Sequence, residues 1–326
     1  MDEVEQVRER FARFAAEEAP GRSHVYEEWA LRVASDDALA AVLARIPAAH
    51  RQPPLVFAVT RLLGAPLDAA EWAAFVFARA DDIVAECAAR SLQTNEPLRC
   101  AALLPALSLI DGPIALLELG ASGGLCLYPD RYSYRYAVSS GEGMAVDPVD
   151  GPSRVVLAAE WDGPPTPLRM PEVVWRAGID LEPRDPHSDA DRTWLTTLVW
   201  PGEEGRRERI ETALDIAAAA PPLLVSGDAG DAALLRAVAA GAPREATLVV
   251  STPGVLPYLP RARRDALIAA IREMDARWIT LDAPGLHDGW TAPIDRGAWP
   301  GGFALALDGR VLAAADPLGA RVAWRA

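Results

Sequence analysis

The sequence contains no lysine, so arginine supplies all 32 of its fixed cationic side chains. This absence excludes a Schiff-base lysine, a pyridoxal phosphate attachment and a Walker-type phosphate loop. Only three cysteines occur in 326 residues and none form a C-x-x-C pair, which argues against structural zinc and a disulfide framework. No apolar run approaches about 18 residues, and the charged N-terminus does not resemble a signal peptide. We therefore expect a soluble cytoplasmic protein with no membrane partner.

Acidic residues outnumber basic ones by 46 to 32, which gives a formal net charge of −14. A strongly acidic surface repels phosphate backbones, so nucleic acid is not an expected partner. Hydrophobic residues make up 51% of the chain and charged residues 24%, which is typical of a globular protein.

The first 110 residues carry helical patterns. Val4, Val7, Phe11 and Phe14 recur at spacings of three to four residues. Asp68 is an expected N-cap, with Glu71 three residues later, as in a capping box. These features predict an all-helical N-terminal region over residues 1–110.

From residue 113 onward, strand-like and helix-like segments alternate, which is typical of parallel βα units. The expected parallel strands are 113–119, 172–180, 221–228, 246–252 and 276–282, followed by an antiparallel pair at 301–309 and 320–326. The pattern predicts an α/β domain over residues 111–326. Its sheet would be doubly wound, mostly parallel and seven-stranded.

Residues 128–171 interrupt this alternation. Tyr132, Tyr134 and Tyr136 fall on one face of an extended run. We expect an inserted hairpin or lid between the helix after the first strand and the second parallel strand. The tyrosines would either pack on the core or face a substrate.

The stretch "ALLELGASGGLCL" (115–127) is the most informative motif, because it fits two chemistries. Gly120-x-Ser122-x-Gly124 has the spacing of a serine hydrolase elbow, with Asp228 or Asp282 and His287 as partners. Read with Glu118, the same turn suits S-adenosylmethionine, because a carboxylate attracts its sulfonium and ammonium groups. A dinucleotide loop would need glycine at 122 and 125 and would place Glu118 near a pyrophosphate.

The motifs of residues 111–326 resemble those of class I S-adenosylmethionine-dependent methyltransferases, a Rossmann-like superfamily. "LLELGASGG" resembles the first motif, "WRAGIDLEP" the second-strand end and "VSGDAGD" the third-strand end. The resemblance implies that the cofactor S-adenosylmethionine is held by the following residues: Glu118, Gly120, Ser122, Gly124, Asp180 on the ribose, Asp228 on the adenine amine, and Ala229. It also implies methyl transfer to a small-molecule acceptor.

A second resemblance covers nearly the whole chain. "QTNEPLRCAALLPAL", "LLELGASGGLCLYPDRYSYRY", "WRAGIDLEPRD" and "WLTTLVWPGEEGRRERIETA" together are similar to an actinobacterial family known only as a domain of unknown function. This resemblance implies an architecture but no substrate.

The acceptor side of the expected site contains three candidate residues. His287 is a candidate general base, because an imidazole titrates near working pH, although it fits a solvated loop equally well. Tyr258 follows the fourth parallel strand, and Asn95 belongs to a polar run that also suits helix capping. Many methyltransferases carry glycine at the position of Ser122. If the turn requires a positive φ there, serine would cost about 1 kcal/mol relative to glycine. A non-catalytic module with the same fold, used for ligand sensing or protein association, is the main alternative to an enzyme.

Overall fold

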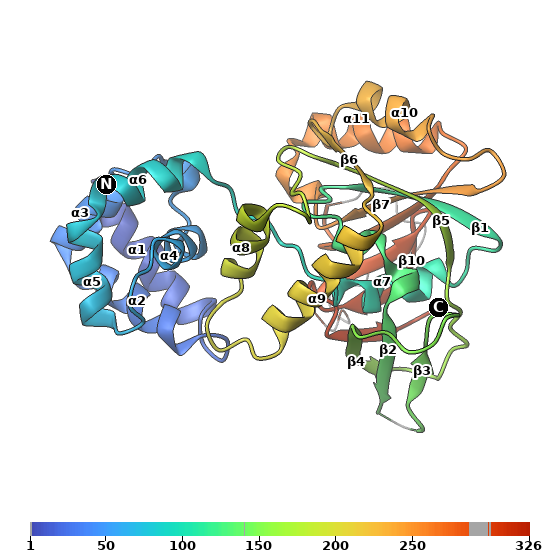
Figure 1. The fold of residues 1–326 in the computed structure, drawn as a ribbon, viewed down its shortest axis with the longest axis horizontal. Helices are drawn as coiled ribbons and strands as arrows, with labels where there is room; N and C mark the ends of the chain where they lie inside the picture. Colours follow the sequence, from blue (N-terminus) through green and yellow to red (C-terminus); the bar gives the residue numbers. More distant parts are fainter. Residues whose placement is uncertain (1, 140, 287–298, 300) are drawn as a thin grey trace. The chain divides into compact units, whose positions relative to one another are not determined.

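The computed structural model describes residues 2–139, 141–286, 299 and 301–326 (Figure 1). The chain divides into two compact units. Unit 1 comprises residues 1–94 and 189–208, and unit 2 comprises residues 95–188 and 209–326. Residues 95–110 therefore belong with the sheet rather than with the preceding helices. Within the described ranges, no helix combines the length and apolarity needed to cross a bilayer.

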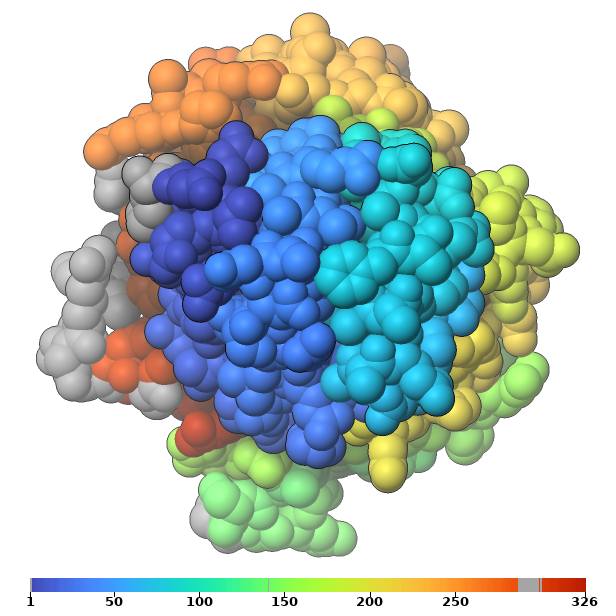
Figure 2. All heavy atoms as spheres, turned by 90° about the vertical axis from the view of Figure 1, so that its left-hand side faces the viewer, coloured from blue at the N-terminus to red at the C-terminus, as the bar shows by residue number. Residues whose placement is uncertain are grey.

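Unit 1 is built from helices (Figure 1). They enclose a core rich in aromatic side chains. Its helices are α1 (Glu3–Glu17), α2 (His24–Ala34), α3 (Asp37–Ala44), η1 (Ala48–His50), α4 (Pro53–Leu62), α5 (Ala69–Ala78), α6 (Ala80–Ala89) and α8 (Asp189–Thr197). Trp29 and Trp72 stack with ring centroids 4.8 Å apart, and Phe57 packs edge-on against both. Asp68 caps α5 by accepting the Glu71 N–H at 3.0 Å, which confirms the predicted cap. Figure 2 shows α1–α6 closely packed, coloured blue to cyan.

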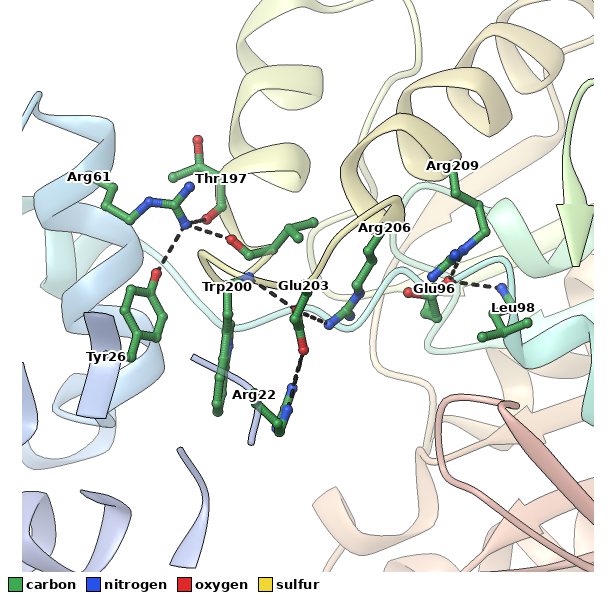
Figure 3. A network of polar contacts seen from close by, with 11 residues as sticks. Arg22, Tyr26, Arg61, Glu96, Leu98, Thr197, Trp200, Glu203, Arg206 and Arg209 are labelled. Atoms are coloured by element: carbon green, nitrogen blue, oxygen red, sulfur yellow. Dashed lines mark hydrogen bonds and ion pairs between the residues drawn. The ribbon is translucent and has the colours of Figure 1, made fainter. Parts of the chain in front are cut away.

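The second segment of unit 1, residues 189–208, is held by one arginine of α4 and one of the turn between α1 and α2 (Figure 3). Arg61 of α4 donates to the carbonyls of Thr197 and Val199 at 2.9 and 2.6 Å. Arg22 donates to Glu203 at 2.8 Å. These contacts join residues far apart in the sequence, which local patterns do not reveal.

Unit 2 contains an eleven-stranded sheet, among the described residues, with the order β3-β2-β4-β11-β10-β9-β8-β7-β1-β5-β6. The strands are β1 (Pro113–Leu119), β2 (Ser133–Val138), β3 (Met144–Val146), β4 (Val156–Asp162), β5 (Glu172–Asp180), β6 (Leu223–Ser226), β7 (Thr247–Pro253), β8 (Arg277–Asp282), β9 (Phe303–Leu307), β10 (Arg310–Ala315) and β11 (Arg321–Trp324). Strands β6, β5, β1, β7 and β8 are mutually parallel, as the alternating pattern predicted.

The expectation of seven strands was wrong for two reasons. First, the C-terminal antiparallel pair is a meander of β9, β10 and β11. The middle strand, "RVLAAA", lies between turns and is rich in alanine, which has little strand propensity. Second, residues 128–171 contribute β2, β3 and β4, and β4 pairs in parallel with β11. The insertion therefore extends the sheet instead of forming a separate lid.

The tyrosines of the insertion pack in the core. Tyr132, Tyr134 and Tyr136 are all buried, and each hydroxyl donates to a main-chain carbonyl at 2.5–2.8 Å. Of the two readings of this run, the core reading is confirmed. β4 alternates exposed and buried residues, so this part of the sheet has one covered face.

Helices α10 (Ala232–Ala239) and α11 (Arg261–Arg272) pack on one face of the parallel strands, against Leu117, Val250 and Trp278 (Figure 1). Glu118 alternates with Leu117 and so faces the opposite side. Helix α7 (Arg99–Leu107) contacts β4, β8 and β9. Helix α9 (Arg206–Ala219) begins at the end of the second segment of unit 1, residues 189–208. The carboxyl ends of β5, β1, β7 and β8 lie along one edge of the sheet.

Candidate functional site

The turn after β1 uses left-handed backbone at three positions. The φ angles of Gly120, Ser122 and Gly124 are 73°, 51° and 72°. The Gly120 N–H donates to the Ile179 carbonyl at 2.8 Å, which ties the turn to the end of β5. The Ser122 φ angle is therefore positive, and the strain expected there, about 1 kcal/mol relative to glycine, lies at the edge where a ligand would bind.

Replacing Ser122 with glycine is expected to raise the free energy of unfolding by about 0.5–1 kcal/mol, because glycine adopts this φ without strain. Urea denaturation measures the change. Ala121→Gly in the same turn is the control, since Ala121 has no positive φ and its replacement should destabilise the protein. A less stable S122G would show that the serine side chain contributes more than its backbone strain costs.

The segment after the turn is not an α-helix. Two short 3₁₀ turns follow, η2 (Leu125–Leu127) and η3 (Pro129–Arg131), and then β2 begins. The helix expected after the first strand is therefore missing, and Pro129 disfavours one here. A hydrolase elbow needs a strand–turn–helix arrangement. The Ser122 hydroxyl also lacks a hydrogen-bond partner among the described residues, so the hydrolase reading gains no support.

Glu118 brings a buried carboxyl group to the start of this turn. Its Oε2 atom has no hydrogen-bond partner within the described part of the chain. Burial raises the pKa of Glu118 well above its ordinary value, the neighbouring Cys126 and Asp180 raise it further, and Arg99 lowers it. A carboxyl group in this setting keeps its proton to a higher pH than an exposed one, and an approaching cation favours its ionised form.

Asp180 ends β5 and points at the turn. Its Oδ2 accepts the Ser122 N–H at 2.8 Å, and its Oδ1 accepts the Glu182 N–H at 2.9 Å. The sequence therefore identified two carboxyl groups, from adjacent strands, that border the same turn. Each Asp180 oxygen already accepts one backbone N–H and keeps a second lone pair for a ligand hydroxyl.

Asp228 and Ala229 follow β6. The Gly230 N–H donates to Asp228 Oδ1 at 2.8 Å, and Arg263 of α11 donates to Oδ2 at 2.7 Å. The Gly230 N–H and the Arg263 charge lower the pKa of Asp228 despite a small opposing effect of burial. Ala229 is buried against the helices of that face. Asp228 is thus engaged by the protein on both oxygens.

Two of the three acceptor-side candidates lie among the described residues, and they differ in burial. Tyr258 ends η4 (Leu256–Tyr258) and is 80% exposed. Asn95 is buried, and its Nδ2 has no partner among the described residues. The next residue, Glu96, accepts from Cys126 Sγ through its carbonyl, which places Asn95 close to the segment after the turn. His287 lies outside the described residues.

Two further residues belong to this edge. Arg99, at the start of α7, is buried and donates to the carbonyls of Pro253 at 3.3 Å and Pro317 at 3.0 Å. Asp282 ends β8, and neither of its carboxyl oxygens has a partner among the described residues. Burial raises the pKa of Asp282 to about 8, while the Arg99 charge and the nearby Gly254 N–H, which itself donates to the Leu281 carbonyl at 2.9 Å, lower it.

Sequence reasoning placed Asp282 at this edge but overlooked Arg99. The available signal was that Arg99 is the only charged residue in the apolar stretch from Pro97 to Ile110. A charged side chain in such a stretch can be buried only where polar groups hydrogen-bond to it.

The model of an uncharacterized protein family conserved in bacteria (DUF2332) matches residues 8–324. The chain belongs to this family. Neither the comparison with curated proteins nor that with solved structures gave a match. The DUF2332 match spans both units, including residues 189–208. It confirms the predicted membership of a family known only as a domain of unknown function.

Two surface hollows in this DUF2332 chain lie away from the turn. One, of about 640 Å³, lies along β2–β4, and the other, of about 430 Å³, lies along β10–β11. They share Glu160 and Ala320 and contain none of the predicted site residues. The candidate site is therefore defined by its buried polar groups.

Proposed function

We propose that this chain binds S-adenosylmethionine at the carboxyl ends of β1 and β5 and transfers its methyl group to a small molecule. The observation that carries the proposal is the pair Glu118 and Asp180. These carboxyl groups come from adjacent parallel strands and border one turn, and Asp180 is hydrogen-bonded to it at 2.8 Å. A ligand with two cationic groups and a ribose, but no phosphate, matches two acids at a glycine turn.

The strand order supports the same location. In β6-β5-β1-β7-β8 the chain order reverses beside β1, between β1 and β7. Ligands of open α/β sheets bind outside the carboxyl ends of the strands at such a reversal. The turn also lacks a following α-helix, so it offers no helix N-terminus for a phosphate, which disfavours a dinucleotide.

The residues present fit the group. Glu118 Oε2, Ser122 Oγ and Asn95 Nδ2 are buried polar atoms for which the described residues supply no partner. Burying such atoms without a partner costs free energy that a polar ligand recovers. Their chemistry, a carboxyl, a hydroxyl and an amide, suits an amino-acid end attached to a sulfonium.

S-adenosylmethionine, when bound, supplies an electrophilic methyl group. The protein's contribution would be to bind and orient. Glu118 would balance the positive charge, Asp180 would accept from ribose hydroxyls, and the positive-φ turn would allow close backbone approach. Aligning an acceptor with the methyl carbon provides much of the acceleration without a strong base.

Isothermal titration calorimetry with S-adenosylmethionine tests the proposal. We expect micromolar binding by the full chain and at least about tenfold weaker binding by Asp180→Asn, because the lost charge weakens the bond to ribose. Asp162→Asn is the matched control, since Asp162 also ends a parallel strand but is 57% exposed beside Arg321. Absence of binding by the wild-type chain would contradict the proposal.

The alternative is a non-catalytic module that retains the fold. Three observations favour it: Val255 Cγ2 lies 3.0 Å from the position a Gly120 Cβ would take, Asp228 is paired with Arg263, and Tyr258 is exposed. Calorimetry combined with a turnover assay distinguishes the enzyme from the non-catalytic module. Binding without S-adenosylhomocysteine formation on any acceptor would favour the module.

A further inference from the structure

Two of the three cysteines lie in contact. The Cys100 thiol of α7 donates to the Cys126 carbonyl at 3.7 Å. Cys126 of η2 in turn donates to the Glu96 carbonyl at 3.5 Å. Both cysteines are reduced and buried. The third, Cys87, lies in α6 of unit 1 and is also buried.

The two thiols are chemically unequal. Cys126 is 7% exposed, and the neighbouring Cys100 thiol together with the Arg99 charge lowers its pKa against the opposing effect of burial. Cys100 is fully buried, and burial raises its pKa well above the ordinary value. The thiolate is the reactive form of cysteine, so Cys126 is the nucleophile of the pair and Cys100 its neighbouring proton donor.

We propose that Cys100 and Cys126 form a thiol–disulfide site that hydroperoxides oxidise. The Cys126 thiolate attacks a peroxide oxygen and becomes a sulfenic acid, while the leaving hydroxide takes up a proton and departs as water. The Cys100 sulfur then attacks the Cys126 sulfur, loses its proton, and releases a second water as the disulfide forms. In sum, two thiols and one hydrogen peroxide give one disulfide and two waters.

The geometry suits this step. The Cys100 sulfur already lies 3.7 Å from the carbonyl oxygen of Cys126, and a disulfide requires the two sulfurs to approach to about 2.05 Å. Cys126 belongs to a single 3₁₀ turn, which can shift more easily than a long helix. Because η2 directly follows the turn 120–124, the disulfide would fix the segment beside Glu118 to α7. This inference does not depend on the proposed function.

Peptide mapping of the full chain after treatment with hydrogen peroxide tests the proposal. Free thiols are blocked by alkylation, and the protein is digested without reductant. We expect a Cys100–Cys126 disulfide to form at least about tenfold faster than Cys87 is oxidised, and dithiothreitol to reverse it. Cys87 serves as an internal control, because burial raises its pKa to about 12 and no other cysteine lies in unit 1.

Two variants assign the roles. Cys100→Ser should leave a sulfenic acid on Cys126 that dimedone traps, whereas Cys126→Ser should leave Cys100 unoxidised. Circular dichroism and thermal melting confirm that both variants are folded. Absence of the disulfide in the wild-type chain, or equal oxidation of all three cysteines, would overturn the proposal. Persistent oxidation of Cys100 in folded C126S would overturn the assigned order.

Discussion

Asp282→Asn is expected to stabilise the protein by about 2–4 kcal/mol at pH 7, an unusual outcome for a buried residue. Asp282 is completely buried at the end of β8, and neither carboxyl oxygen has a partner among the described residues. Burial raises its pKa from 3.8 to about 8. The folded state must therefore keep a proton at neutral pH that the unfolded chain releases. Asparagine is nearly the same size and needs no proton.

The stabilisation should depend on pH in a defined direction. Between about pH 4 and pH 8 the folded state binds a proton and the unfolded state does not, so stability of the wild type falls as pH rises. Below about pH 4 both states are protonated and the penalty vanishes. The advantage of D282N should thus be small at pH 4 and grow until about pH 8. Urea denaturation at several pH values measures it.

Asp162→Asn is the control for this series, because the Asp162 side chain is 57% exposed. Its effect on the free energy of unfolding should be small at every pH. A D282N variant that is less stable than the wild type, or equally stabilised at pH 4 and pH 8, would contradict the explanation. A stabilised variant would indicate that the acid is kept for function at the expense of stability.

Local patterns predicted the central strands of the sheet well, because each is a short apolar run followed by a helix or a turn. β1 and β5 have the predicted bounds, and β6, β7 and β8 differ by no more than two residues at either end. β10 was missed because packing between β9 and β11 overrides the weak strand propensity of its alanines. The pairing of β4 with β11 joins residues about 160 positions apart, and no local period encodes such a contact.

The candidate site was predictable where a residue follows a strand directly. Glu118 and Asp180 end adjacent strands, so the pattern placed both at one edge, and the structure brings them to the same turn. Arg99 was not predictable in this way, because its position depends on how α7 packs. Likewise, the ion pair between Asp228 and Arg263 depends on how α11 packs, because the two residues are 35 positions apart in the sequence.

Binding of S-adenosylmethionine, on the proposed function, should strengthen as pH rises through the range in which Glu118 of the free protein titrates, by up to about tenfold per unit. Burial raises the pKa of Glu118 in the free protein, so the carboxyl group keeps its proton to a higher pH than an ordinary glutamate does. A cationic ligand favours the ionised carboxylate, and binding therefore releases a proton. Above about pH 8 the gain should end, because the ligand's own amino group begins to lose its charge.

Calorimetry in two buffers of different ionisation enthalpy measures this proton release directly. Glu118→Gln should bind more weakly and show little release, while Asp162→Asn should behave like the wild type. S-adenosylhomocysteine separates the two charges of the ligand, because it keeps the ammonium and lacks the sulfonium. If its affinity does not vary with pH, Glu118 senses the sulfonium, and if it varies equally, Glu118 senses the ammonium. An E118Q variant that retains the wild-type pH dependence would show that Glu118 is not the group whose titration is coupled to binding.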